Sequence, residues 1–266
     1  VGIALNINDF LDKINRLLHV KSKVNSVEEE IKLMIIGGIP FKNLNESIAI
    51  DVGGSNTKGG YLIDNDKEKN DNFLPINSNY GTVTLTEKIK KNLINPDDFN
   101  EFMLNSKKFS DSIKQSFKTK LSANSIFNRR NNLYFSGGTI WAFITLSQNK
   151  DKNDYKIFSL EEVKSYQKDL IFNFEKFQKL SYTNPDVKKV LDTYSRQYLI
   201  SGNIILLNIM ENINNIETKN IYFVSNGHLS WLKAYILETK KHTDKELKNS
   251  TYLNPKNIVT FKTSEF

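Results

Sequence analysis

The stretch from Ser47 to Tyr61 constrains the fold of this chain most, because it combines an apolar strand, an acid, a glycine turn and a second strand. Its sequence is SIAIDVGGSNTKGGY. The apolar residues 48–50 have the length of a buried strand, and Asp51 follows where that strand ends. Glycine permits positive φ and close approach of other backbone, so a turn such as residues 53–57 can direct several N–H groups and hydroxyls at one anion. The pattern predicts a phosphate-binding turn, and an ordinary tight hairpin is the alternative.

Two later segments repeat the arrangement of an apolar run followed by a polar glycine turn. Residues 133–135 precede Ser136-Gly137-Gly138-Thr139, and the apolar residues 140–146 behind this turn predict a helix. Residues 221–224 precede a third turn, Ser225-Asn226-Gly227. Strands that end in glycine turns and are separated by helices predict an α/β fold in which the turns face one crevice.

Helical spacing of apolar residues predicts most of the remaining elements. An amphipathic helix is expected over residues 10–18, and Ser26 to Glu29 form an S-x-x-E capping box that opens a second helix. Further helices are expected at residues 98–104, 110–123, 160–177, 186–194, 199–213 and 229–239, and further strands at residues 60–63, 81–85 and 258–261.

The charge balance bears on the partners. The chain has 37 basic and 30 acidic residues, a net charge of +7, which favours a polyanion such as polyphosphate, a nucleotide or nucleic acid. Lysine is spread along an Asn- and Ile-rich chain, so compositional bias is the simpler explanation. No nucleic-acid reader motif occurs, and nucleic acid is not an expected partner. No run approaches the roughly 18 apolar residues of a membrane span, so no membrane association is expected.

The absence of cysteine in the 266 residues excludes disulfides, thiolate zinc sites and cysteine nucleophiles. It fits a reducing compartment, and we expect a cytoplasmic protein. The three histidines, His19, His228 and His242, lie far apart in sequence and lack the spacing of metal ligands. The length allows one large domain or two small ones.

Five motifs in order along the chain resemble one known family. They begin at Ser26 (SVEEEIKL), Ile50 (IDVGGSNTK), Gly81 (GTVTLTE), Gly137 (GGT) and Arg196 (R-x-x-x-x-x-G, followed by SNG after Val224). They are similar to the S-G-x-E-E-A-R-L, I-D-I-G-G-G-S-T-E, G-x-V-x-L-T-E, G-G-T and R-x-x-x-x-x-G with S-x-G segments of the exopolyphosphatase and guanosine pentaphosphate phosphohydrolase family. The matches cover nearly the whole chain.

The resemblance implies the actin-like (ribonuclease H-like) ATPase fold, an α/β fold with a mixed sheet flanked by helices. The family's first phosphate loop, D-x-G-S-N, should precede a helix like residues 10–18, and nothing like it occurs before Ser26. We therefore expect residues 1–27 to be the end of a first, mostly missing domain. Residues 28–240 would form the second actin-like domain and residues 241–266 a C-terminal tail.

Carried over by position, the resemblance also implies a site for phosphoanhydride hydrolysis. Glu30 would be the general base, and Asp51 the catalytic carboxylate on the side of a bound Mg²⁺. Phosphate would be held by Gly53, Gly54, Ser55, Asn56, Thr57 and Lys58 on one wall, and by Gly137, Gly138 and Thr139 on the other. Without the resemblance, Glu30 is explained as part of the acidic first turn of a helix.

Several residues depart from the family pattern. Lys58 stands where the family's loop has a carboxylate, and reversing a charge within about 5 Å of a metal or phosphate changes the interaction by several kcal/mol. Lys58 could instead bind phosphate directly. Asn56 replaces a hydroxyl residue. Ser230, Trp231 and Leu232 stand where the family has R-E-G.

These departures slightly favour a catalytically silent relative that binds phosphate, polyphosphate or a nucleotide and serves a binding or structural role. The alternative is an active, Mg²⁺-dependent phosphohydrolase of polyphosphate or guanosine pentaphosphate. Residues 51–58 also look like the D-x-G-G-T-x-x-K loop of sugar kinases, but that loop lies near the start of such kinases, whereas 46 residues precede Ser47 here. A homodimer and a place in a larger assembly both stay open.

Overall fold

The computed structural model describes residues 6–19, 22, 24–63, 72–73, 76–122, 124–147 and 155–237. The strands are β1 Ser47–Val52, β2 Thr57–Gly60, β3 Leu62–Ile63, β4 Asn72–Phe73, β5 Ile76–Ser78, β6 Asn132–Ser136, β7 Tyr155–Ile157 and β8 Asn220–Val224. The α-helices are α1 Ile7–Leu18, α2 Val27–Gly38, α3 Thr82–Lys90, α4 Phe99–Ser122, α5 Ser125–Arg129, α6 Gly138–Leu146, α7 Leu160–Phe172, α8 Phe174–Ser181, α9 Pro185–Thr193 and α10 Arg196–Met210, followed by a helix at residues 230–237. Short 3-10 helices are η1 Phe41–Glu46, η2 Ile216–Thr218 and η3 Gly227–Leu229.

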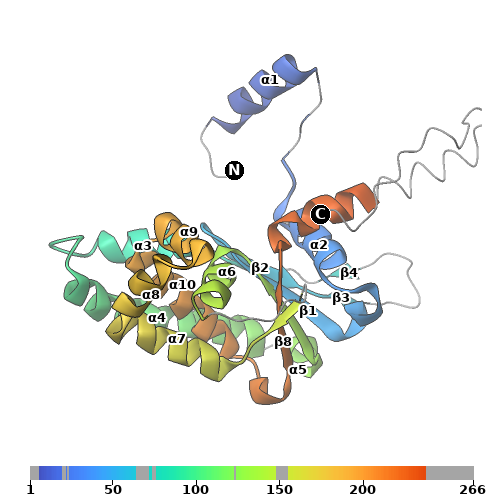
Figure 1. Ribbon diagram of the computed structural model, residues 1–266. Coiled ribbons are helices and arrows are strands. Elements are labelled where there is room, and N and C mark those ends of the chain that lie inside the picture. Colours follow the sequence, from blue (N-terminus) through green and yellow to red (C-terminus); the bar gives the residue numbers. More distant parts are fainter. Residues whose placement is uncertain are drawn as a thin grey trace, which may run out of the picture.

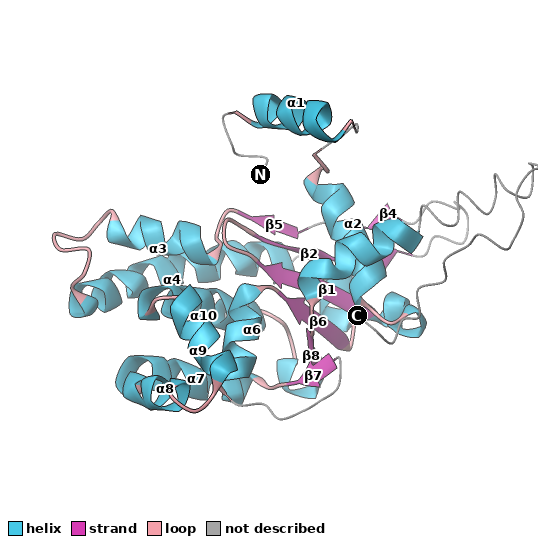
Figure 2. Cartoon of the chain, turned by 45° about the horizontal axis from the view of Figure 1, so that its top comes forward, coloured by secondary structure: helices cyan, strands magenta, loops and turns pink. Residues whose placement is uncertain are grey.

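Six strands form one mixed sheet in the order β5-β2-β1-β6-β8-β7 (Figure 2). The central strands β1, β6 and β8 run parallel to one another, while β2, β5 and β7 pair antiparallel with their neighbours. Strands β3 and β4 form a separate two-stranded ribbon. The mixed sheet with flanking helices confirms the predicted α/β class.

The two faces of the sheet are buried against different helices because side chains alternate along each strand. On β1, Ile48, Ile50 and Val52 enter the large core formed with helices α3, α4, α6, α7 and α10. Ala49 and Tyr134 point to the opposite face, where they pack with Ile31 and other residues of α2. Figure 1 shows α10 surrounded by other helices on the side of the large core, and α2 on the opposite face of the sheet. Asp51 shares the α2 face with Ala49.

The structure changes several expected elements. The strand predicted at residues 81–85 is wrong, because Gly81 is the N-cap of helix α3. The two helices predicted at residues 98–104 and 110–123 are one 24-residue helix, α4. The helix predicted at residues 160–177 is interrupted at Asn173, which ends α7 and precedes α8. The strand predicted at residues 258–261 lies outside the described residues.

Helix α1 stands apart from the rest of the molecule in Figure 1. None of its residues is buried, and the apolar side chains of Phe10, Leu17 and Leu18 are exposed. Helix α2, by contrast, starts with the predicted capping box, in which Ser26 and Glu29 bond to each other's backbone N–H. None of the helices within the described ranges has the combined length and apolarity of a membrane span.

Candidate functional site

The candidate carboxylates meet on the α2 face of the sheet, near the carboxyl end of β1. The antiparallel register of β1 and β2 places Asp51 directly opposite Lys58, because the turn between the strands is only four residues long. The parallel register of β1 and β6 places Asp51 beside Ser136. Directly paired residues on one face have Cβ atoms about 4.5–5.5 Å apart. Glu30 reaches this point from the first turn of α2.

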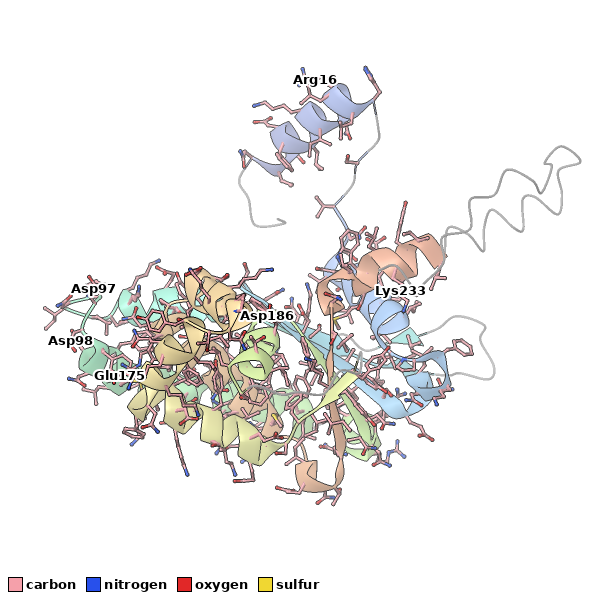
Figure 3. The ribbon with its side chains drawn as sticks, viewed as in Figure 1. Arg16, Asp97, Asp98, Glu175, Asp186 and Lys233 are labelled. Atoms are coloured by element: carbon pink, nitrogen blue, oxygen red, sulfur yellow. The ribbon has the colours of Figure 1, made fainter. Side chains whose placement is uncertain are left out.

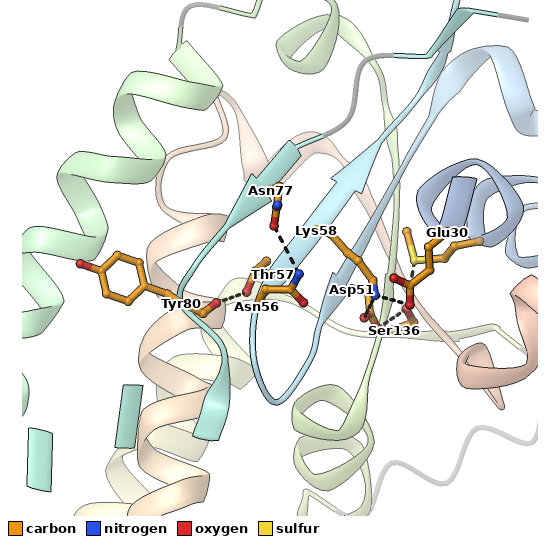
Figure 4. A network of polar contacts seen from close by, with 9 residues as sticks. Glu30, Asp51, Asn56, Thr57, Lys58, Asn77, Tyr80 and Ser136 are labelled. Carbon is orange, nitrogen blue, oxygen red and sulfur yellow. Dashed lines mark hydrogen bonds and ion pairs between the residues drawn. The ribbon is translucent and has the colours of Figure 1, made fainter. Parts of the chain in front are cut away.

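Lys58 forms ion pairs with both carboxylates, as the dashed contacts around it in Figure 4 show. Its Nζ lies 2.5 Å from Oε1 of Glu30 and 3.9 Å from Oδ2 of Asp51. The Lys58 side chain is only 12% exposed, whereas that of Glu30 is 43% exposed. The two predicted catalytic carboxylates are therefore brought together, with a largely buried ammonium group in contact with both.

Asp51 is further held by Ser136, whose Oγ donates a hydrogen bond of 2.8 Å to Oδ1. Burial raises the pKa of Asp51 above its usual value, and this effect outweighs the Lys58 ammonium and the Ser136 hydrogen bond, which both lower the pKa. The ionised form thus exists here at a cost in desolvation that its partners offset only in part.

Mg²⁺ shared by Glu30 and Asp51 does not fit this arrangement. Mg²⁺ needs oxygen ligands at about 2.0–2.1 Å in a nearly octahedral shell. The Lys58 ammonium lies between the same two carboxylates. Two unit charges of the same sign about 4 Å apart repel by about 4 kcal/mol at an effective dielectric constant of 20, and the charge of Mg²⁺ doubles this. Lys58 therefore supplies the positive charge that a metal ion would otherwise bring to these carboxylates.

Within the described residues, no group of three or more acidic or histidine side chains is arranged to hold a metal ion. Figure 3 shows Asp97, Asp98 and Glu175 at the helical end of the molecule and Lys233 toward the other end. All four are exposed.

The first glycine turn, residues 53–56, is bound to the start of helix α3. The carbonyl of Gly53 accepts a hydrogen bond from the N–H of Thr82, and the carbonyl of Gly54 accepts from Val83 and Thr84. These bonds satisfy the N–H groups of the first turn of α3, which a helix cannot pair internally. The exposed tip of the turn keeps the N–H groups of Gly54 and Ser55, and neither donates to another described residue.

The side chains of the other residues predicted to bind phosphate at this turn, Asn56, Thr57 and Lys58, have partners within the protein. The hydroxyl of Thr57 is buried and donates to the carbonyl of Tyr80 at 2.7 Å. Nδ2 of Asn56 donates to Oδ1 of Asn77 at 3.3 Å, a contact also drawn in Figure 4. The side chains of Thr57 and Lys58 are thus engaged within the protein, and the backbone of Gly54 and Ser55 remains available to a ligand.

The second glycine turn packs against the first strand of the site. Gly137 is the N-cap of α6, with φ of 107°, a conformation that residues with a Cβ rarely adopt. A Cβ on Gly137 would lie 2.4 Å from the carbonyl oxygen of Val52 and 3.0 Å from Oδ1 of Asp51. No side chain caps α6, so its first N–H groups, including those of Gly138 and Thr139, face the region beside Asp51 without a side-chain acceptor.

Thr139 joins the two helix starts. Its Oγ1 lies 2.6 Å from Oγ1 of Thr82, so the first turns of α6 and α3 are hydrogen-bonded to each other. The hydroxyl of Tyr194 covers Gly138, since a Cβ there would lie 2.1 Å from that oxygen. Burial raises the pKa of Tyr194. The structure thus places Gly137 against Asp51, with Gly138 beneath the Tyr194 hydroxyl and Thr139 bonded to Thr82.

Sequence reasoning missed Ser136, Thr82 and Tyr194 as members of this site. Ser136 could have been identified from the sequence. It is the last residue of its strand and directly precedes a glycine pair, and only one residue separates Asp51 from the glycine pair of the first turn. Thr82 was assigned to a strand, which hid its place at a helix start. Tyr194 has no local signal, because tertiary packing alone brings it to Gly138. Arg196 of the fifth motif has a structural role, donating to the carbonyls of Leu170 and Ile171 at the end of α7.

Comparisons with known sequences identify no relative: no family model matches the chain, and neither does any curated protein. Comparisons with solved structures do find similar folds. A Ppx/GppA family member from Aquifex aeolicus matches with a TM-score of 0.61 and 18% identity, over 89% of this chain and 71% of that chain.

The type II variant of the Aquifex aeolicus Ppx/GppA phosphatase has a TM-score of 0.56 and 19% identity, over 85% of this chain and 70% of that one. An exopolyphosphatase from Cytophaga hutchinsonii has a TM-score of 0.56 and 14% identity, over 84% of this chain and 67% of that one. At this identity the likeness shows the fold, which is the actin-like fold of these proteins. These solved structures belong to the family that the sequence motifs resemble. Their low identity to this chain agrees with a divergent sequence.

Proposed function

We propose that this chain, exopolyphosphatase-like in its fold, binds a phosphate, polyphosphate or nucleotide ligand and does not hydrolyse it. It would serve a binding or structural role. The observation that carries this proposal is the pair of ion contacts from Lys58 to Glu30 and Asp51, at 2.5 and 3.9 Å. A general base must be free to accept a proton from water, and an ammonium group bound to Glu30 competes with that role.

The ligand would bind between the two glycine turns. Candidate donors are the N–H groups of Gly54 and Ser55 at the exposed tip of one turn and those of Gly138 and Thr139 at the start of α6. The positive end of the α6 dipole favours an anion at this position. Lys58 adds one positive charge on the same side of the sheet. The hydroxyl of Tyr194, against Gly138, is a further donor within reach of this region.

An active hydrolase is the second candidate, favoured by the convergence of two carboxylates, Glu30 and Asp51, on one point. In that case a ligand would have to draw Lys58 away from Glu30 onto its own phosphate, freeing Glu30 as a base. Mg²⁺ would then have to bind through Asp51, against the like charge described above. The position of Lys58 therefore favours the first candidate.

Phosphate release from inorganic polyphosphate tests the proposal, measured alongside equilibrium binding of tripolyphosphate to the full chain. We expect the wild type to bind and to release no phosphate above background with Mg²⁺. Lys42→Glu is the matched control for Lys58→Glu, because Lys42 is an exposed lysine on η1 and the change in charge is the same. Lys58→Glu should weaken tripolyphosphate binding, and Lys42→Glu should not. Turnover by the wild type that Glu30→Gln abolishes would overturn the proposal.

A further inference from the structure

A polar pocket lies beyond the first glycine turn, on the side of the sheet's β5 edge. It has a volume of about 250 Å³ and is lined by residues that include Asn77, Asn79, Tyr80, Lys88, Ser116 and Lys120. Sites for drug-sized ligands have volumes of about 300–1,000 Å³ and mostly apolar walls. This pocket is smaller and polar, which suits a compact charged ligand.

Two exposed lysines line this pocket, and the ammonium group of each has one contact with the lining. Nζ of Lys120 donates a hydrogen bond of 2.5 Å to the backbone carbonyl of Asn77. Nζ of Lys88 lies 4.9 Å from the centroid of the Tyr80 ring, within the range of a cation–π contact. Neither lysine forms an ion pair with a carboxylate among the described residues. Their positive charges are therefore available to an anion.

The part of the lining formed by Asn77 and Tyr80 is tied to neighbouring elements by hydrogen bonds and strand pairing. The carbonyl of Tyr80 accepts the Thr57 hydroxyl, and the phenol of Tyr80 bonds to Ser112 at 3.1 Å. Asn77 belongs to β5 and is paired with Lys58 of β2. Groups already held in place lose little conformational entropy when a ligand binds, which favours affinity.

The pocket adjoins the first glycine turn without including it. Asn56 of the turn bonds to Asn77, and Oγ1 of Thr84 donates toward the carbonyls of both Ser55 and Asn79. A continuous polar surface therefore runs from the tip of the turn to the two lysines. An elongated anion could contact both.

We propose that this pocket is a binding site for an inorganic oligophosphate chain, held by Lys88 and Lys120 with Ser116, Asn77 and Asn79 as hydrogen-bonding groups. Each phosphate group carries negative charge and several acceptors, which matches two ammonium groups and neighbouring polar side chains. A nucleotide is disfavoured, because Lys88 covers one face of the Tyr80 ring on which a base would stack. The site is distinct from Glu30, Asp51 and Lys58, so it does not depend on the proposed function.

Lysine acetylation with and without tripolyphosphate tests this site on the full chain. We expect tripolyphosphate to slow the acetylation of Lys88 and Lys120. Lys91 and Lys108 are the matched internal controls, because they are exposed and border or lie on the same helices but do not line the pocket. Equal slowing at all four lysines would mean general charge screening and would overturn the proposal. Equal protection by ATP without Mg²⁺ would contradict an inorganic ligand.

Affinity provides the second readout. Lys88→Ala/Lys120→Ala should weaken tripolyphosphate binding by at least about tenfold, since a hydrogen bond to a charged group typically contributes more than the 1.4 kcal/mol that corresponds to a factor of ten. Lys91→Ala/Lys108→Ala removes the same charge and should change the affinity by less than about twofold. Equal losses in the two double variants would refute the pocket. Lys58→Ala separates the two proposals, because it leaves the protection of Lys88 and Lys120 unchanged if the pocket binds by itself.

Discussion

Lys58 determines the chemistry of the site at the scale of single residues. In the sequence it is one unexpected residue within an otherwise familiar loop. In the structure its position opposite Asp51 follows from the short turn between β1 and β2, and its contact with Glu30 follows from the packing of α2 on the sheet. The sequence identified all three residues, but the ion pair between Lys58 and Glu30 depends on tertiary packing that no local pattern encodes.

Asp51 should make the stability of the protein depend on pH. Its folded pKa lies above its usual value, so the folded state binds more protons than the unfolded state as the pH rises from about 3.8 through the raised pKa. Stability therefore falls with rising pH over this window. Asp51→Asn removes this titration, so its melting temperature relative to the wild type should be higher at pH 7 than at pH 3. Thermal unfolding of both proteins across this range measures the difference.

Ser136→Ala is the control for this experiment, because it removes a hydrogen bond to Asp51 and leaves the carboxyl group in place. Losing that bond raises the pKa of Asp51 further, since the bond favours the ionised form. The decline in stability with pH should then persist in Ser136→Ala. An Asp51→Asn variant that follows the wild type in parallel at every pH would show that Asp51 is not the titrating group.

At the scale of elements, helix α3 shows how packing overrides local propensity. Residues 82–86 are TVTLT, a β-branched run that predicts a strand. The carbonyls of Gly53 and Gly54 pair with the first N–H groups of the segment, and α10 packs along it. Thr86 in addition bonds to Ser201 of α10 at 2.8 Å. The helix is stabilised by partners distant in sequence, which a local pattern does not reveal.

Gly81 and Gly54 form a matched pair for testing the junction between the turn and α3. A Cβ on Gly81 would lie 2.5 Å from the backbone atoms of the turn, whereas a Cβ on Gly54 would meet only the Val83 side chain at 3.4 Å. We expect Gly81→Ala to destabilise the protein by about 1–3 kcal/mol, the usual cost of overpacking. At about 2–4 °C per kcal/mol, thermal unfolding resolves this loss. Gly54→Ala should cost much less, and equal losses would contradict the described packing.

Short edge strands were the elements that the sequence predicted least well. β5 and β7 have three residues each, too few to show the alternation that identifies a strand. The central strands β1, β6 and β8 were predicted because each is a nearly continuous apolar run, as expected for strands covered on both faces. The break between α7 and α8 was missed because apolar spacing continues through Asn173.

At the scale of the whole molecule, the sheet brings both glycine turns and Asp51 to one region. β1 and β6 are parallel neighbours, so the turns that follow them lie at the same edge, where ligands bind in open α/β sheets. The sequence could predict this convergence, because strands that end in glycine turns and alternate with helices along the chain indicate parallel strands. It could not predict the lysine pocket, which depends on how α3 and α4 pack beside β5.

The response of the whole protein to Mg²⁺ tests the central claim most directly, namely that the Lys58 ammonium takes the place of a metal ion between Glu30 and Asp51. The measurement is the melting temperature with and without Mg²⁺ for the wild type, Lys58→Ala and the surface control Lys42→Ala. The account predicts no Mg²⁺-dependent rise for the wild type or the control. It predicts a rise for Lys58→Ala, because a ligand at about 100 times its Kd adds about 2.7 kcal/mol to stability. A rise in the wild type as large as in Lys58→Ala would contradict it.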